Sequence, residues 1–135
     1  MHKAKEYLLK YQAARRRAER IERQIRELKE KYSLPSAIRY SDMPKSLNVE
    51  HDLSDYAAKL DELVGYLVKT YSVCIGIEGD ILKRLDMMED EKEAELLRLK
   101  YIQGLTWTEI ATTTPYYIRH IYRIHGKALD HFPLP

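Results

Sequence analysis

Residues 104–132 read GLTWTEIATTTPYYIRHIYRIHGKALDHF, and this stretch carries the most informative pattern in the 135-residue chain. Thr106 is followed three residues later by Glu109, which is a capping box that begins a short helix through Ile110 and Ala111. The sequence TTTP at 112–115 ends this helix, and a last helix is predicted from about 116 to 132. Two helices separated by so tight a break are typical of a helix-turn-helix.

The last predicted helix has an apolar side and a basic side. At 100° per residue, the apolar side is expected to face a core with Ile118, Ile121, His125, Ala128 and Phe132. The opposite side groups side chains that bind bases and phosphates, namely Tyr116, Arg119, His120, Arg123 and Lys127. Arginine binds guanine through two hydrogen bonds and lysine binds phosphate, so this side is suited to the major groove of DNA.

The helix before the break adds two candidate backbone contacts. Thr106 and Thr108 stand near its N-terminus, where hydroxyls and free N–H groups are expected to meet DNA phosphates. A further amphipathic helix is predicted over 91–103, with Gly104 ending it and the acidic residues at 89–91 capping its start.

These residues resemble region 4 of the sigma-70 class of bacterial sigma factors, which carries a Gly-Leu-Ser-Tyr-x-Glu-Ile-Ala segment and a recognition helix ending in Arg-Ala-Leu. The similarity runs without a gap from about Glu91 to Phe132. The runs YRIHGKAL at 122–129 and YSDMP at 40–44 resemble, more particularly, the small sigma-region-4-like regulators of phages and prophages of the RinA/ArpU type. The resemblance implies binding to a promoter-like DNA element and transcriptional control, with RNA polymerase as a further candidate partner.

The chain departs from the sigma pattern at the break and inside the last helix. Thr114-Pro115 replaces Leu-Gly, and Tyr117 replaces the serine that would cap the recognition helix. We therefore expect Thr114 to be the N-cap and Pro115 the first helical residue. His125 replaces a leucine and is expected to be a buried, hydrogen-bonded histidine.

The first two-thirds of the chain predicts two long helices with coiled-coil seams. The first seam runs in steps of four and three from Tyr7 to Tyr32. The second runs from Leu53 to Ile81 and on to Met88, with Asp52 or Ser54 as the cap at its start. A connector at 33–51 containing Pro35 and Pro44 joins them.

Neither long helix buries its seam alone. Each seam can pack against the other long helix of the same chain, against a helix of a second chain, or against both. We expect a homodimer through these helices, because a single two-helix hairpin buries only a small apolar core. The predicted fold is therefore all-α, with a coiled-coil arm at 1–88 and a helix-turn-helix domain at 89–135.

Composition and charge exclude several classes of protein. The net charge is +2, with eleven Lys/Arg against five Glu in residues 1–32. The run Arg15-Arg16-Arg17 is a candidate phosphate-binding patch, but the glutamates near it favour a solvent-exposed face of a coiled-coil helix. The five histidines and the single cysteine, Cys74, are not spaced like the ligands of a metal site, and Cys74 is instead a residue of the second seam. The sequence also contains no set of residues typical of a catalytic site and no cofactor-binding motif. No signal peptide or membrane-spanning stretch is visible, so a cytoplasmic location in a bacterial host cell is expected.

The function that these observations predict is sequence-specific binding of double-stranded DNA to control transcription of phage or prophage genes. The alternative is a helical phage assembly, packaging or scaffolding protein that acts through its coiled coil. The C-terminal third has six basic against seven acidic residues, which keeps this alternative open.

Overall fold

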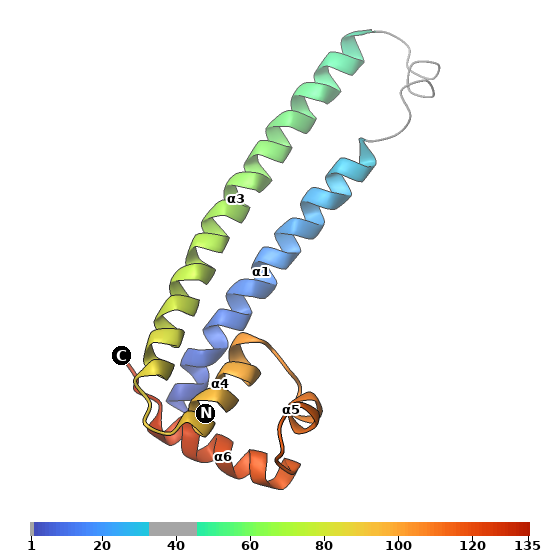
Figure 1. Ribbon diagram of the computed structural model, residues 1–135. Coiled ribbons are helices and arrows are strands. Elements are labelled where there is room, and N and C mark those ends of the chain that lie inside the picture. The colour runs from blue at the N-terminus through green and yellow to red at the C-terminus, as the bar shows by residue number, and fades with distance from the viewer. Residues whose placement is uncertain (1, 33–45) are drawn as a thin grey trace. The chain divides into compact units, whose positions relative to one another are not determined.

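The computed structural model describes residues 2–32 and 46–135, and side chains only outside 46–51. Every regular element in these ranges is helical, which confirms the all-α prediction there (Figure 1). The two long helices are α1 (Lys3–Lys31) and α3 (Ser46–Asp86). The C-terminal helices are α4 (Glu91–Leu97), the π-helical segment η1 (Arg98–Ile102), α5 (Trp107–Thr113) and α6 (Ile118–His131).

The second long helix begins earlier than predicted. It starts at Ser46, so Asp52 and Ser54 lie inside it and neither is its cap. Residues 46–51 contain no glycine or proline, and nothing in their backbone chemistry stops the helix from extending toward its N-terminus. The predicted connector therefore shortens to 33–45, which lies outside the described residues.

The chain forms two compact units whose limits differ from the predicted boundary at 88/89. The smaller unit is residues 16–71, and the larger unit combines residues 1–15 with 72–135. The first turns of α1 and the last turns of α3 therefore belong with the C-terminal helices, because they share a core with them.

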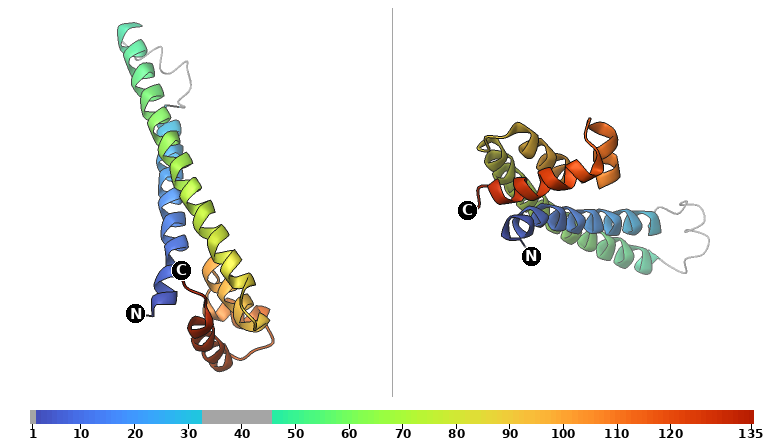
Figure 2. Two further views of the ribbon diagram at one scale, coloured as in Figure 1. Left: turned by 90° about the vertical axis from the view of Figure 1, so that its left-hand side faces the viewer. Right: turned by 90° about the horizontal axis from the view of Figure 1, so that it is seen from below.

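In the smaller unit, the segments of α1 and α3 pair antiparallel within the chain (Figures 1 and 2). Ala18 and Leu63 are buried, and the rings of Tyr32 and Tyr56 lie 4.7 Å apart between centroids. Leu53, which was placed in the predicted seam, is 54% exposed. Antiparallel pairing through seam residues is one of the arrangements that the heptad pattern allowed.

The larger unit has a core to which both ends of the chain contribute. Tyr101 of η1 and Leu97 of α4 are buried against side chains from α1, α3 and α6. The buried residues of this cluster are Ala4, Leu8, Tyr11, Cys74, Ile81, Leu85, Leu97, Tyr101, Ala128, Leu129 and Phe132. Helices α4 and α6 and the segment η1 therefore share this cluster with the ends of the two long helices.

A second cluster lies between α4, η1, α5 and α6. Its buried members are Leu96, Leu99, Ile110, Ile121 and Ile124. Ile121 and Ala128 are buried as predicted, but Ile118 is 42% exposed. Ile118 is the first residue of α6, and it is not among the residues of either buried cluster. Among the described helices, none combines the length and apolar character that a membrane crossing requires.

Candidate nucleic-acid interface

The N-terminus of α5 is fixed by the predicted capping box. The Glu109 N–H donates to Thr106 Oγ1 at 3.1 Å, and the Thr106 N–H donates to Glu109 Oε1 at 3.2 Å. Thr106 and Thr108 are both exposed. The Thr106 hydroxyl oxygen serves as the cap acceptor, and its hydrogen is left to donate to an outside acceptor.

The segment before α5 turns sharply and is anchored to α1. Gly104 has φ +71°, a left-handed conformation that favours glycine, and the Leu105 N–H donates to Leu99 O at 3.1 Å across it. Gln12 Nε2 donates to Lys100 O at 3.0 Å.

Asp90 caps α4 by accepting hydrogen bonds from Lys92 N and Glu93 N, as the acidic run at 89–91 predicted.

The break between α5 and α6 differs from the prediction. Thr114 does not cap α6, because its hydroxyl donates to Ile110 O at 2.8 Å and its backbone is extended at the end of α5. An extended conformation is what a following proline favours, since its ring hinders the helical conformation of the residue before it. The N-cap of α6 is Tyr117, which makes no side-chain cap hydrogen bond, and the helix runs over 118–131 instead of 116–132.

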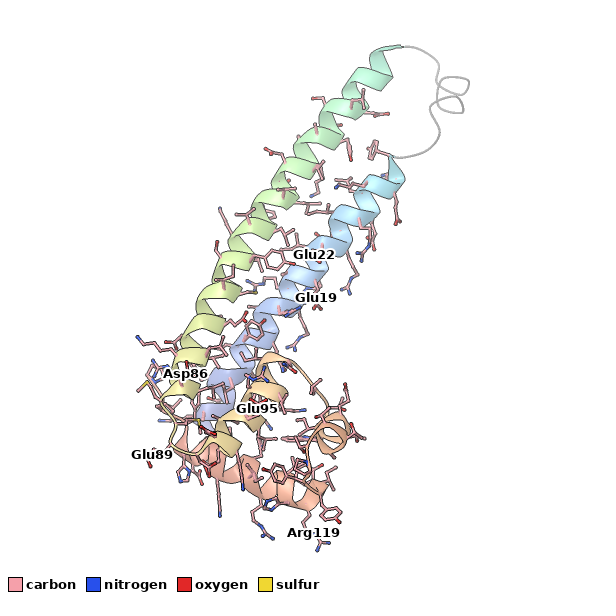
Figure 3. The ribbon with its side chains drawn as sticks, viewed as in Figure 1. Glu19, Glu22, Asp86, Glu89, Glu95 and Arg119 are labelled. Atoms are coloured by element: carbon pink, nitrogen blue, oxygen red, sulfur yellow. The ribbon has the colours of Figure 1, made fainter. Side chains whose placement is uncertain are left out.

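The exposed side of α6 is basic. Arg119, Arg123 and Lys127 are all exposed and recur every four residues, and His120 is exposed beside them. Arg119 projects away from the ribbon at the start of the helix (Figure 3). The only acid in α6 is Asp130, whose Oδ1 lies 3.0 Å from His2 Nε2. The four predicted contacts inside the helix therefore share one solvent-facing side.

Tyr116 and Tyr117 have different surroundings. Tyr116 precedes the helix and is half-buried, with its ring 5.2 Å from that of His120 and packed against the second cluster. Tyr117 is 86% exposed, the most exposed of the large apolar side chains that the structure describes. Sequence reasoning treated Tyr117 only as a missing cap. Its position directly before a basic helix is a sequence signal that marks it as a candidate contact but was not used.

His125 is held on the inner side of α6, as expected. Its Nε2 lies 2.8 Å from the Tyr101 hydroxyl, and its ring is 4.7 Å from that of Trp107. Burial lowers the pKa of His125 to about 4, helped by the positive charges of Lys5, Lys100 and His2. Burial also raises the pKa of Tyr101 to about 12. The imidazole is therefore neutral near pH 7 and joins α6 to η1 and α5.

The C-terminal end of α6 is fastened by polar contacts. His131 Nδ1 lies 2.6 Å from Oε1 of Glu93, a carboxylate that is almost fully buried. Hydrogen bonding to Glu93, with its negative charge, raises the pKa of His131. Arg84 Nη1 donates to Pro133 O at 2.9 Å. The C-terminal end of α6 is thus held by these contacts, while Arg119 and His120 near its N-terminal end are exposed.

A groove in the larger unit has a different character. It has a volume of about 830 Å³ and lies between the end of α3, α4 and the α5–α6 turn. Its rim includes Asp86, Glu89, Glu91 and Glu95 beside Lys92 and Arg98. Asp86 and Glu89 lie well away from Arg119 (Figure 3). This acidic rim is a poor surface for phosphates, whereas the exposed side of α6 is basic.

No group of three or more His, Cys, Asp or Glu that could hold a metal ion occurs in the described part of the chain. Comparison with known proteins found no matching family model, no matching curated protein and no matching solved structure.

Proposed function

We propose that this protein is a sequence-specific DNA-binding regulator of transcription, with α6 as its recognition helix. The observation that carries the proposal is the exposed side of α6, on which Arg119, Arg123 and Lys127 follow one another at one-turn spacing beside His120. A helix fits the major groove, and a row of this length faces several successive base pairs.

Each side chain takes a role that follows from its chemistry. Arg119, His120 and Arg123 read base edges, with arginine directed to guanine O6 and N7. Lys127, Thr106 and Thr108 bind phosphates and fix the position of the helix on the duplex. Tyr116 supports His120 from the start of the helix, since their rings lie 5.2 Å apart.

The sequence resemblance adds the biological setting. Similarity to sigma-region-4-like regulators supports control of phage or prophage genes in the bacterial cytoplasm, with RNA polymerase as a second partner. A homodimer would carry two copies of α6 and bind two half-sites, so a two-fold symmetric target sequence is expected.

The test begins with selection of bound duplexes from a random DNA library by the full chain. Affinity for the enriched sequence is then measured by fluorescence anisotropy at several salt concentrations. We expect Arg123→Ala to cost about 1–3 kcal/mol of specific binding, and Lys127→Ala to reduce the salt slope by about one.

The matched control is Arg16→Ala/Arg17→Ala, which removes two exposed arginines from α1 in the smaller unit. Its specific binding should equal that of the natural chain, whereas Arg119→Ala/Arg123→Ala should abolish discrimination between sequences. Absence of any enriched sequence, or equal losses in both double variants, contradicts the proposal.

The second candidate function is assembly or scaffolding of phage particles through the long helices. Large apolar side chains exposed on α3, such as Val68 and Tyr66, favour it. Under this alternative, selection from the DNA library enriches no sequence. Substitutions on α3 then abolish assembly of phage particles, while substitutions on α6 do not.

A further inference from the structure

The groove in the larger unit has an apolar floor. It lies between the end of α3, α4 and the α5–α6 turn, and its volume is about 830 Å³. Of its lining residues, Leu85, Leu96, Leu99 and Ile124 are buried. Apart from Tyr116, the residues that line the groove take no part in the proposed DNA contact. An open groove with an apolar floor is suited to receive apolar side chains of a ligand.

The rim of this groove carries acidic charge that the chain does not neutralise. Asp86, Glu89 and Glu91 are exposed, and no ion pair involves them in the part of the chain that the structure describes. Asp86 and Glu89 lie where α3 ends and the chain turns into α4 (Figure 3).

The basic side chains on the rim do not balance these three acids. Arg98 is already paired, because its Nη2 donates to Glu95 Oε1 at 2.6 Å and its Nε donates to Glu95 Oε2 at 2.9 Å. Lys92 is then the one basic group on the rim that faces Asp86, Glu89 and Glu91. The rim therefore attracts cations and repels nucleic acids and anionic lipids.

The methionines at the end of α3 are suited to a surface that adapts to a ligand. Met88 lines the groove and is half-buried, and Met87 beside it is 63% exposed. Methionine is unbranched and flexible, so it can pack against apolar side chains of different shapes, and it is frequent on surfaces that bind peptides.

We propose that this groove binds a basic amphipathic helical segment of a partner protein. The apolar side of the segment packs on the floor, and its lysines and arginines lie over Asp86, Glu89 and Glu91. An amphipathic helix in an apolar groove is a common mode of peptide recognition, and complementary charges at the rim select the partner. This inference does not depend on DNA binding.

The partner is a different protein and not a second copy of this chain. The basic helices of this chain are α1 and α6, and the fold already buries their apolar sides, for example at Ala18 and Ile121. Among the described residues, a second copy therefore has no basic helix with a free apolar side to offer.

Fluorescence anisotropy of the full chain with three labelled peptides tests the chemistry of the occupant. The first is a helical peptide of about twelve residues with leucine on one side and lysine elsewhere. The second replaces every lysine with glutamate, and the third has the composition of the first in an order without an apolar side. The first should bind about tenfold more tightly than either of the others. Equal binding of the second overturns the basic partner, and equal binding of the third overturns the apolar contact.

Charge reversal at the rim tests the location. Asp86→Lys/Glu89→Lys should weaken binding of the first peptide about tenfold while the helical circular dichroism signal stays unchanged, because both side chains are exposed. The matched control, Asp61→Lys/Glu62→Lys, reverses two exposed acids of α3 in the smaller unit. It should bind like the natural chain. Equal weakening in the two double variants overturns the groove as the site.

NMR spectra of the isotope-labelled full chain distinguish the remaining occupants. The first peptide should shift the amide signals of Leu85, Met88 and Leu96 most strongly. A response centred on the exposed Val64 and Val68 of α3 would place the peptide elsewhere and overturn the proposal. A peptide that dissociates a dimer of the chain in sedimentation equilibrium would show that a second copy fills the groove, which also overturns it.

Discussion

At the scale of single residues, His125 links α6 to the two segments that precede it. Its imidazole meets the Tyr101 hydroxyl at 2.8 Å and the Trp107 ring at 4.7 Å. The ordinary histidine pKa of 6.5 falls to about 4 here, mainly because the ring is buried. The folded chain therefore holds His125 neutral over a pH range in which the unfolded chain protonates it.

This difference predicts how stability depends on pH. The contribution of neutral His125 is fully present above pH 6.5 and is lost as the pH falls toward 4, because the unfolded state then binds the extra proton. The urea midpoint of the natural chain should therefore decrease over this window relative to His125→Gln, which does not titrate there. Parallel pH dependence in the two chains would show that His125 is not responsible.

The pH dependence that His131 gives to the free energy of unfolding has the opposite sign to that of His125. Glu93 raises the pKa of His131, so its contribution is fully present below pH 6.5 and is lost as the pH rises through the raised value. The two contributions change in adjacent pH windows, that of His125 below pH 6.5 and that of His131 above it, and the His131 contribution is the same in both chains. Only the difference between the natural chain and His125→Gln isolates the buried imidazole.

At the scale of single elements, α5 depends on its cap because it is only seven residues long. Such a helix is not stable by itself, and the free N–H groups at its start need an acceptor. Thr106→Ala should lower the free energy of unfolding by about 1 kcal/mol, measured by urea denaturation. Thr112→Ala in the same helix is the control.

The control has a physical basis. The Thr112 hydroxyl donates to Glu109 O at 2.8 Å within the helix, a contact that adds little and competes with the helix backbone. Thr112→Ala should therefore leave stability unchanged within about 0.5 kcal/mol. Equal losses in both variants would mean that the capping box contributes no more than an ordinary surface threonine.

At the scale of the whole molecule, α4, η1 and α6 share a core with the ends of the long helices. Leu97, Tyr101 and Phe132 pack in one cluster with Leu8 of α1 and Ile81 of α3. A fragment of residues 89–135 would expose this half of the core. We expect it to lack a cooperative thermal transition, because one or two kcal/mol already decides the stability of so small a domain.

A chain that joins residues 1–15 to 72–135 through a short glycine-serine linker is the matched comparison, since it retains the complete larger unit. It should unfold cooperatively by circular dichroism and keep the helical signal of α4 to α6. A cooperative transition in the 89–135 fragment would show that the C-terminal helices form a domain of their own after all.

Local chemistry in the sequence determined most of the secondary structure. The Thr106–Glu109 capping box, the turn at Gly104, the cap at Asp90 and the inward His125 follow from short-range pattern, because each depends on residues within a turn or on helical periodicity. The basic side of α6 follows for the same reason. Its side chains are exposed where the helical wheel placed them.

Tertiary structure decided what depends on contacts between distant segments. The 42% exposure of Ile118, on the side of α6 that the helical wheel predicted to be apolar, depends on which helices pack against that side. The shared core of the larger unit joins residues more than a hundred positions apart, such as Leu8 and Phe132. A periodic pattern identifies which face of a helix is apolar, but only the fold shows which of those faces the chain itself covers and which it leaves exposed.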